Sequence, residues 1–226
     1  MKAMPENLDP CDIWILTEHR EGTFTGDTFG LANEARKLLS HLNAKGRVTA
    51  VVLGWELPDD LETLGEYGVD RVLCLESETL SHYHGERFAG VFCRLIKRLA
   101  PTGLLAAQTV NTADLCARLG GLLESGVATH AMDLKVDKDG KWIVTRPVAN
   151  GYLFEDFALE CDPTPVVSFL PAVLLPAEKI RTQAATVDFI LVENPPDGIK
   201  TEVVEVIEAD PETLDIEEAD IIVSGG

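Results

Sequence analysis

Basic residues are scarce in this sequence: 19 lysines and arginines face 38 aspartates and glutamates, which gives a formal net charge of −19 at pH 7. Nucleic-acid binding depends on Lys and Arg side chains that displace counterions from phosphates, so this acidity excludes a direct nucleic-acid binder. The imbalance is greatest over residues 193–226, where Lys200 is the one base among eleven acidic residues. That segment is either a solvated surface or a docking surface for a basic partner.

Long apolar runs are also missing. No stretch approaches the roughly 20 apolar residues that a membrane helix requires, so we expect no membrane insertion. The first ten residues are polar, and we expect no signal peptide. No two cysteines have the C-x-x-C spacing, which predicts reduced and mostly buried thiols in a cytoplasmic protein. The five cysteines are Cys11, Cys74, Cys93, Cys116 and Cys161.

Recognisable catalytic motifs are absent as well. The sequence has no G-x-S-x-G, no H-E-x-x-H and no paired-carboxylate pattern, which disfavours a hydrolase. His82 and His84 form an H-x-H pair without a third ligand nearby, so we expect loop histidines rather than a metal site. We expect His130 to be a structural histidine. Cys93 and Cys161 have no neighbouring base that would activate a thiol.

Apolar runs alternate with helix-spaced apolar residues through the first half of the chain. This alternation with short connections predicts an α/β fold with a doubly wound, Rossmann-like and mainly parallel sheet. We expect strands at 12–17, 48–53, 71–75, 104–107 and 127–131. We expect helices at 31–42, at 58–67 with Pro58 in the first turn and Gly68 as the C-cap, at 88–99, and after Asn111 or Thr112 as the N-cap.

The second half changes character. Residues 132–136 and 141–146 flank the hairpin turn signal Asp137-Lys138-Asp139-Gly140. Further strands are expected at 152–159, 166–170, 187–192 and 201–207, so that the sheet gains an antiparallel β extension at one edge. The prolines at 195–196 suggest a division into a Rossmann-like domain, 1–194, and an acidic linker with the start of another domain, 195–226.

Two loops are weak candidates for binding a nucleotide. Ligands of open α/β sheets bind beyond the carboxyl ends of the strands, where both loops lie. The first loop offers Glu18, Gly22 and Gly26, although it has neither the G-x-G-x-x-G nor the P-loop pattern. The second opens a helix with small polar residues, which are equally consistent with a helix cap. Its candidates are Thr109, Asn111 and Thr112.

The sequence ends on an expected strand, 219–223, followed by Ser224, Gly225 and Gly226. A strand leading into a glycine turn is how many nucleotide-binding domains begin, with a helix next. A lone strand cannot bury itself unless it pairs elsewhere. The two interpretations are therefore that the chain was cut at this point, or that the strand joins the sheet of this domain.

Several of these segments, in this order and spacing, resemble the N-terminal domain of the electron transfer flavoprotein alpha subunit. The matching segments are Thr17-Glu18-His19 with the helix that follows, Tyr67-Gly68-Val69-Asp70-Arg71-Val72, Leu115-Cys116-Ala117-Arg118-Leu119, Arg146-Pro147 and residues 217–226. One departure is that Val148-Ala149-Asn150-Gly151 follows Arg146-Pro147, with Tyr152 displaced from the family's aromatic position.

The resemblance implies a Rossmann-like fold of the adenine nucleotide alpha hydrolase-like type and a non-catalytic electron-carrier component. The implied partner is a beta subunit, with which this domain forms a platform. A separate C-terminal domain carries FAD in that family, AMP sits in the beta subunit, and dehydrogenases and a quinone-reducing acceptor are indirect partners. Ser224, Gly225 and Gly226 resemble the start of the FAD domain, so the chain itself is expected to bind no FAD.

Two other functions remain open at this point. The first is a stand-alone adenine-nucleotide-binding or stress-type protein that self-associates and binds its nucleotide at the two loops. The second is an enzyme of the nucleotide-hydrolase-like group, for which the missing phosphate motif is unfavourable.

Overall fold

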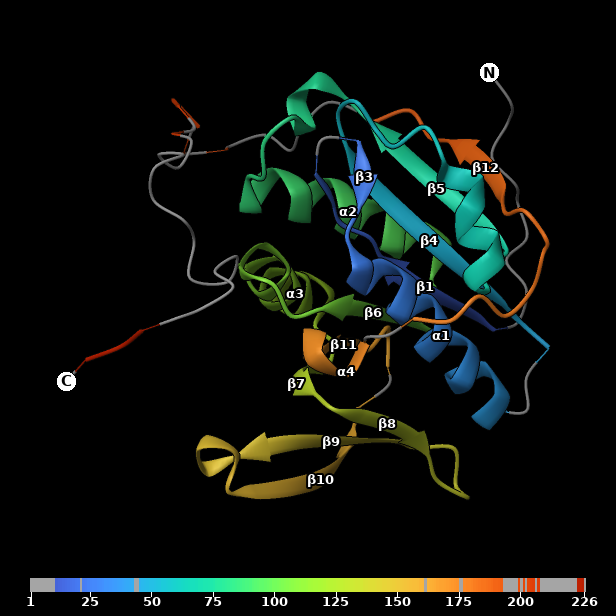
Figure 1. Ribbon diagram of the computed structural model, residues 1–226, viewed down its shortest axis with the longest axis vertical. Helices are drawn as coiled ribbons and strands as arrows, with labels where there is room; N and C mark the ends of the chain where they lie inside the picture. The colour runs from blue at the N-terminus through green and yellow to red at the C-terminus, as the bar shows by residue number, and fades with distance from the viewer. Residues whose placement is uncertain are drawn as a thin grey trace.

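The structure is a computed structural model, and it describes residues 11–20, 22–42, 45–160, 162–174, 177–192, 199, 201, 203–205, 207 and 223–225. Within these residues, seven parallel strands form one sheet, the main sheet, in the order β12-β5-β4-β1-β6-β11-β7 (Figure 1). Their bounds are β1 Asp12–Leu16, β4 Arg47–Gly54, β5 Arg71–Glu76, β6 Gly103–Ala107, β7 Val127–Ala131, β11 Val166–Phe169 and β12 Thr186–Phe189. The predicted doubly wound α/β fold is confirmed.

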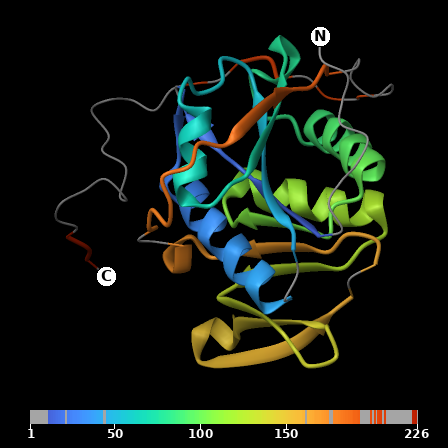
Figure 2. The same ribbon diagram turned by 90° about the vertical axis from the view of Figure 1, so that its right-hand side faces the viewer.

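Helices cover both faces of the main sheet, which explains why its central strands are buried and mostly apolar. Ile13 and Ile15 of β1 pack in a cluster with α1, Gly26–His41. Trp14 and Leu16 point to the opposite face, in a cluster with α2, Gly85–Leu99, and α3, Val110–Leu123. Figure 2 shows α1 on one side of the sheet and the other two helices on the far side.

Two helix starts differ from the sequence prediction. The helix expected at 58–67 is a 3-10 helix, η1 Leu61–Tyr67, which begins after Asp60 and leaves Pro58 outside its first turn. Gly68 caps its end at φ 111°, as expected. The N-cap of α3 is Thr109, not Asn111 or Thr112. Thr109 and Thr112 form a reciprocal capping box, which satisfies two backbone N–H groups at once.

The later strands enter the fold differently from the expectation. The segments expected at 166–170 and 187–192 are β11 and β12, and both join the main sheet in parallel. Since β11 lies between β6 and β7, the strand expected at 127–131 is an edge strand rather than the neighbour of β6. A short helix, α4 Pro171–Leu174, follows β11, and 3-10 turns lie at η2 Glu78–Leu80 and η3 Ala149–Gly151.

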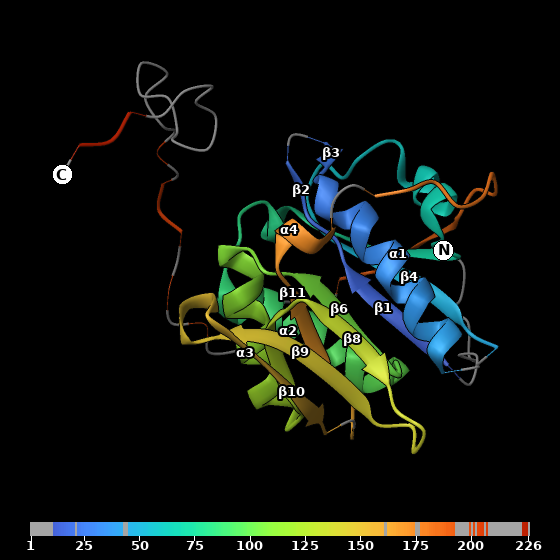
Figure 3. The same ribbon diagram turned by 60° about the horizontal axis from the view of Figure 1, so that its bottom comes forward.

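The antiparallel extension is a separate layer in the part of the chain that the structure describes. Three strands form this antiparallel sheet in the order β10-β9-β8, with bounds β8 Asp133–Val136, β9 Trp142–Val148 and β10 Leu153–Leu159. The predicted antiparallel extension is confirmed, but it forms a sheet of its own instead of continuing the edge of the main sheet. The antiparallel sheet packs beneath α1 and β7 instead (Figure 3). A small hairpin, β2 His19–Arg20 with β3 Thr23–Phe24, follows β1.

One end of the antiparallel sheet is anchored and the other is exposed. Trp142 is buried, and its ring packs directly on the backbone of Gly103. A Cβ at position 103 would lie 2.2 Å from this ring, so only glycine fits at the start of β6. At the other end, Tyr152, Leu153 and Phe154 are 86%, 62% and 61% exposed. We call these three residues the hairpin tip.

Some expectations fall on segments that are described in part or not at all. Residues 201, 203–205 and 207 lie in no strand, which contradicts the strand expected at 201–207 for those positions. Most of the strand expected at 219–223 and all of Cys161 lie outside the described residues. Among the described helices, none has the length and apolar character that crossing a membrane requires.

Candidate functional site

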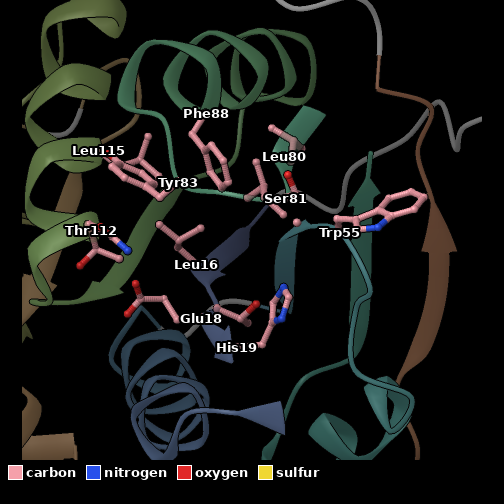
Figure 4. Close-up of a pocket in the computed structure, with 14 residues that line it drawn as sticks. Leu16, Glu18, His19, Trp55, Leu80, Ser81, Tyr83, Phe88, Thr112 and Leu115 are labelled. Atoms are coloured by element: carbon pink, nitrogen blue, oxygen red, sulfur yellow. The ribbon is translucent and has the colours of Figure 1, made fainter. Parts of the chain in front are cut away.

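A pocket of about 170 Å³ opens at the carboxyl edge of the main sheet, beside the end of β1 (Figure 4). The chain passes from β1 to β4 on one side, and the later strand β6 lies on the other. This reversal of strand order is where open α/β sheets usually bind ligands. We call it the switch-point pocket.

Apolar side chains form one part of the walls of the switch-point pocket. They come from the ends of β1 and β4, from η2, and from the N-terminal halves of α2 and α3, and they are Leu16, Leu53, Leu80, Phe88 and Leu115. Trp55 lies on the rim with 44% of its surface exposed. A cavity of this size holds a small ring or a few waters rather than a dinucleotide, since drug-sized ligands occupy roughly 300 Å³ or more.

Glu18 supplies the negative charge of the pocket. Thr109 Oγ1 donates a hydrogen bond to Glu18 Oε1 at 3.0 Å, and Figure 4 shows the carboxylate directed toward Thr112 at the start of α3. Burial raises the pKa of Glu18, and the Thr109 hydrogen bond and the charge of Arg20 act in the opposite direction. A helix N-terminus attracts anions, and here a carboxylate of the chain itself lies at that position.

His19 lies beside Glu18 in the same pocket. Burial lowers the pKa of His19, against a smaller raising effect of its hydrogen bond to the backbone of Leu53, so the ring is neutral at neutral pH. Its ring packs against Gly54 at the end of β4, where a Cβ would lie 2.6 Å from Nε2. Gly54 is therefore required for the position of His19.

Tyr83 closes the side of the pocket near α2. Its hydroxyl donates to Asp114 Oδ2 at 2.7 Å, and Asp114 also pairs with Arg118 Nε at 2.8 Å. Burial, followed by the Asp114 hydrogen bond, raises the pKa of Tyr83, so the phenol stays protonated. This hydroxyl is thus committed to Asp114 rather than available to a substrate.

The structure brings together some of the predicted candidates and separates others. Glu18, Asn111 and Thr112 line the switch-point pocket, and Thr109 contacts Glu18 directly. Gly22, at φ 70°, turns the β2–β3 hairpin, and Gly26 is the exposed first residue of α1. Neither glycine lines the pocket, because the hairpin carries the loop away from it.

His19, Trp55 and Tyr83 also line the pocket, although they were not among the site residues predicted from the sequence. Trp55 had a usable signal, since an aromatic residue directly follows the glycine that ends a buried strand. Tyr83 had none, because it belongs to an irregular segment between η2 and α2.

The other histidines differ from the sequence expectation in part: His84 is a helix cap rather than a loop residue, and His130 is exposed. His84 is buried and is the N-cap of α2, whereas His82 is exposed. His130 is an exposed residue of β7 at φ 58°. Burial raises the pKa of the Cys93 thiol. Among the described residues, no group of three or more potential ligands could hold a metal ion.

The switch-point pocket does not fit FAD. The switch-point pocket is too small for an isoalloxazine ring joined to an adenine dinucleotide, and its helix N-terminus already faces Glu18. Ser224 and Gly225 are exposed and lie in no helix or strand, and Gly226 lies outside the described residues. We therefore derive no electron-transfer step through these residues.

Comparison with known proteins gives a consistent result. Residues 13–209 match the electron transfer flavoprotein domain. The chain is 30% identical over 218 residues to the electron transfer flavoprotein subunit alpha of Thermoanaerobacterium thermosaccharolyticum, covering 95% of this chain and 64% of that protein. It is 29% identical over 217 residues to the protein FixB of Clostridium saccharobutylicum, covering 95% and 63%.

A third relative is the acryloyl-CoA reductase electron transfer subunit beta of Anaerotignum propionicum, 25% identical over 240 residues, with 95% of this chain and 65% of that protein covered. The chain thus spans a little under two thirds of the length of these relatives.

Proposed function

Because this chain belongs to the electron transfer flavoprotein family, we propose that it is the N-terminal, partner-binding domain of an alpha subunit. In this proposal it takes part in flavin-mediated electron transfer as a heterodimer with a beta subunit. Its own role is to hold the partner, and it catalyses no reaction. FAD, the electron carrier of the assembly, is then held by residues other than those described here.

The observation that carries the proposal is the hairpin tip. Tyr152, Leu153 and Phe154 expose three large apolar side chains in a row, at the free end of a sheet whose other end is buried. Burying such a cluster is favourable, and aromatic residues are enriched among the side chains that dominate interface energies. A protein surface with this composition supports a permanent or frequent partner rather than exposure to water.

The edge of β10 adds to this surface. β10 is the outer strand of the antiparallel sheet in the described part of the chain, so one row of its backbone groups faces outward. Arg146 on β9 pairs with Glu155 and lies over the ring of Phe157 at 4.8 Å from its centroid. These contacts hold the strands rigid behind the exposed side chains, which lowers the entropy cost of docking.

The switch-point pocket supports a role without a phosphate ligand. Glu18 lies at the N-terminus of α3, and a phosphate at the same place would meet a like charge. This disfavours the stand-alone nucleotide binder, which needs that helix end for its phosphates. It also disfavours a nucleotide-hydrolase-like enzyme.

Finer parts of the proposal follow from the family resemblance. AMP would be bound by the beta subunit, and dehydrogenases and a quinone-reducing acceptor would be indirect partners in the cytoplasm. The division between a Rossmann-like domain, 1–194, and an acidic linker, 195–226, belongs to the same proposal.

Native mass spectrometry of the protein captured from its own cells tests the proposed function, because it measures partner, stoichiometry and retained nucleotide together. We expect a one-to-one complex with a beta-type subunit, with any AMP on the partner. A homodimer that carries a nucleotide and no partner would overturn the proposal and favour the stand-alone nucleotide binder.

A further inference from the structure

Thr201, which follows β12 in the sequence, lies at the N-terminal end of α2. His84 Nε2 lies 2.9 Å from the backbone oxygen of Thr201 and 2.8 Å from its Oγ1, and the two residues are 117 positions apart in the sequence. His84 is 7% exposed, although Thr201 itself is an exposed residue outside every helix and strand. A buried imidazole thus contacts a residue that lies far away in the sequence and at the surface.

The hydrogen bonds of His84 fix the direction of this contact. The Arg87 backbone N–H donates to Nδ1 at 3.4 Å, as part of the helix cap, so Nδ1 must be the unprotonated nitrogen of a neutral ring. Nε2 then carries the proton and donates to Thr201, whose carbonyl and hydroxyl oxygens share it. Both ring nitrogens are occupied, one by α2 and one by Thr201.

A second contact lies further along the same helix. Ile190 is buried and donates its N–H to the Cys74 oxygen at 2.8 Å, just beyond the end of β12. Ile190 and Val192 join the apolar cluster that contains Val91 and Leu95 of α2. The chain therefore contacts α2 in its second half at Val192 and at its N-terminal end at Thr201.

We propose that the outer end of α2 is a docking site for the chain's own carboxy-terminal segment and that His84 is the residue that anchors it. The anchor fixes the position of Thr201 relative to α2. It holds Thr201 at the N-terminal end of α2, where the neighbouring Tyr83 lines the switch-point pocket.

Trypsin cleavage after Lys200 tests the anchor, because the protease must extract Thr201 to cut the Lys200–Thr201 bond. His84→Asn is the informative variant. Asn is a good N-cap and keeps the acceptor for the Arg87 N–H, but its side chain is too short to reach Thr201. We expect release of the 201–226 fragment to become roughly three- to tenfold faster, the factor set by one lost hydrogen bond.

Three controls make the result specific. His82→Asn changes the exposed neighbour and is expected to leave the rate unchanged. Cleavage after Lys138, in an exposed turn of the same molecule, gives the internal reference. Thr201→Ala, which removes Oγ1 and leaves the carbonyl, is expected to give a smaller increase without loss of thermal stability.

The proposal is overturned if His84→Asn releases the fragment at the wild-type rate with an unchanged melting temperature. An equal acceleration in His82→Asn would overturn it as well, because the effect would then not come from the bond to Thr201.

Discussion

The carboxyl edge of the main sheet and the hairpin tip are two candidate binding regions of this fold, and they are built in opposite ways. At the carboxyl edge, charged and polar groups are paired within the chain: Glu18 with Thr109, and Tyr83 with Asp114. At the hairpin tip, Tyr152, Leu153 and Phe154 are largely exposed and apolar.

This difference indicates which of the two regions would gain free energy by binding a partner. A site whose polar groups already satisfy one another loses hydrogen bonds when a ligand enters, whereas exposed apolar surface gains free energy when it is covered. A fold-level analogy would place function at the switch point, as in most open α/β proteins. In this chain the exposed apolar side chains favour the antiparallel sheet as the region that binds a partner.

The largest effect is expected on stability, and it distinguishes a core residue from a residue of the hairpin tip. Trp14 is fully buried and stacks on Phe92 with ring centroids 6.2 Å apart. Trp14→Ala is expected to lower the free energy of unfolding by about 3–5 kcal/mol, measured by urea denaturation. Phe154→Ala serves as the comparison and should cost less than about 1 kcal/mol, because Phe154 is 61% exposed. Similar costs for both variants would show that the hairpin tip is part of the core.

The second prediction concerns a substitution in the hairpin tip that is expected to weaken partner binding and leave the protein folded. Phe154→Asp is expected to weaken binding of the beta-type subunit at least about 30-fold, or ~2 kcal/mol, because a charge would be buried in an apolar contact. Isothermal titration calorimetry measures the dissociation constant. Val110→Asp is the matched control: Val110 is 89% exposed at the start of α3, where an acidic residue is tolerated. If both variants bind like wild type, the tip is not the interface.

The smallest effect concerns the carboxyl edge and its pH dependence. Since burial raises the pKa of Glu18 above its usual 4.5, this carboxyl stabilises the fold fully at pH values below 4.5. Its contribution is lost as the pH rises through the higher folded-state pKa. Glu18→Gln keeps an acceptor for Thr109 and cannot ionise. The melting temperature of Glu18→Gln relative to wild type is therefore expected to rise between pH 4.5 and pH 7, and a difference that stays constant would contradict this account.

Local patterns predicted the repeating part of the fold well. Buried strands such as β4 and helices such as α2 follow from apolar runs and helical spacing, which depend on near neighbours alone. The insertion of β11 between β6 and β7 did not follow, because strand order depends on the packing of segments that are distant in sequence. For the same reason the separate antiparallel sheet was placed at the edge of the main sheet.

The candidate site was predicted in part. The rule that loops at carboxyl ends of strands meet gave Glu18, Asn111 and Thr112 correctly as neighbours in one pocket. It could not predict that Glu18 accepts a hydrogen bond from Thr109, 91 positions away. Because of that contact, a carboxylate of the chain itself lies at the N-terminus of α3, where an anionic ligand would otherwise bind. The exposure of the hairpin tip also had no local signal, because apolar strand residues are usually buried.

Hydrogen–deuterium exchange of the chain, free and bound to the proposed beta-type subunit, tests the central claim most directly, because it compares both regions in one experiment. The account predicts that binding slows exchange in peptides covering η3 and β10, and leaves the peptides of the β1–α1 loop and the start of α3 unchanged. Slower exchange at those two carboxyl-edge segments, with β10 unaffected, would contradict it.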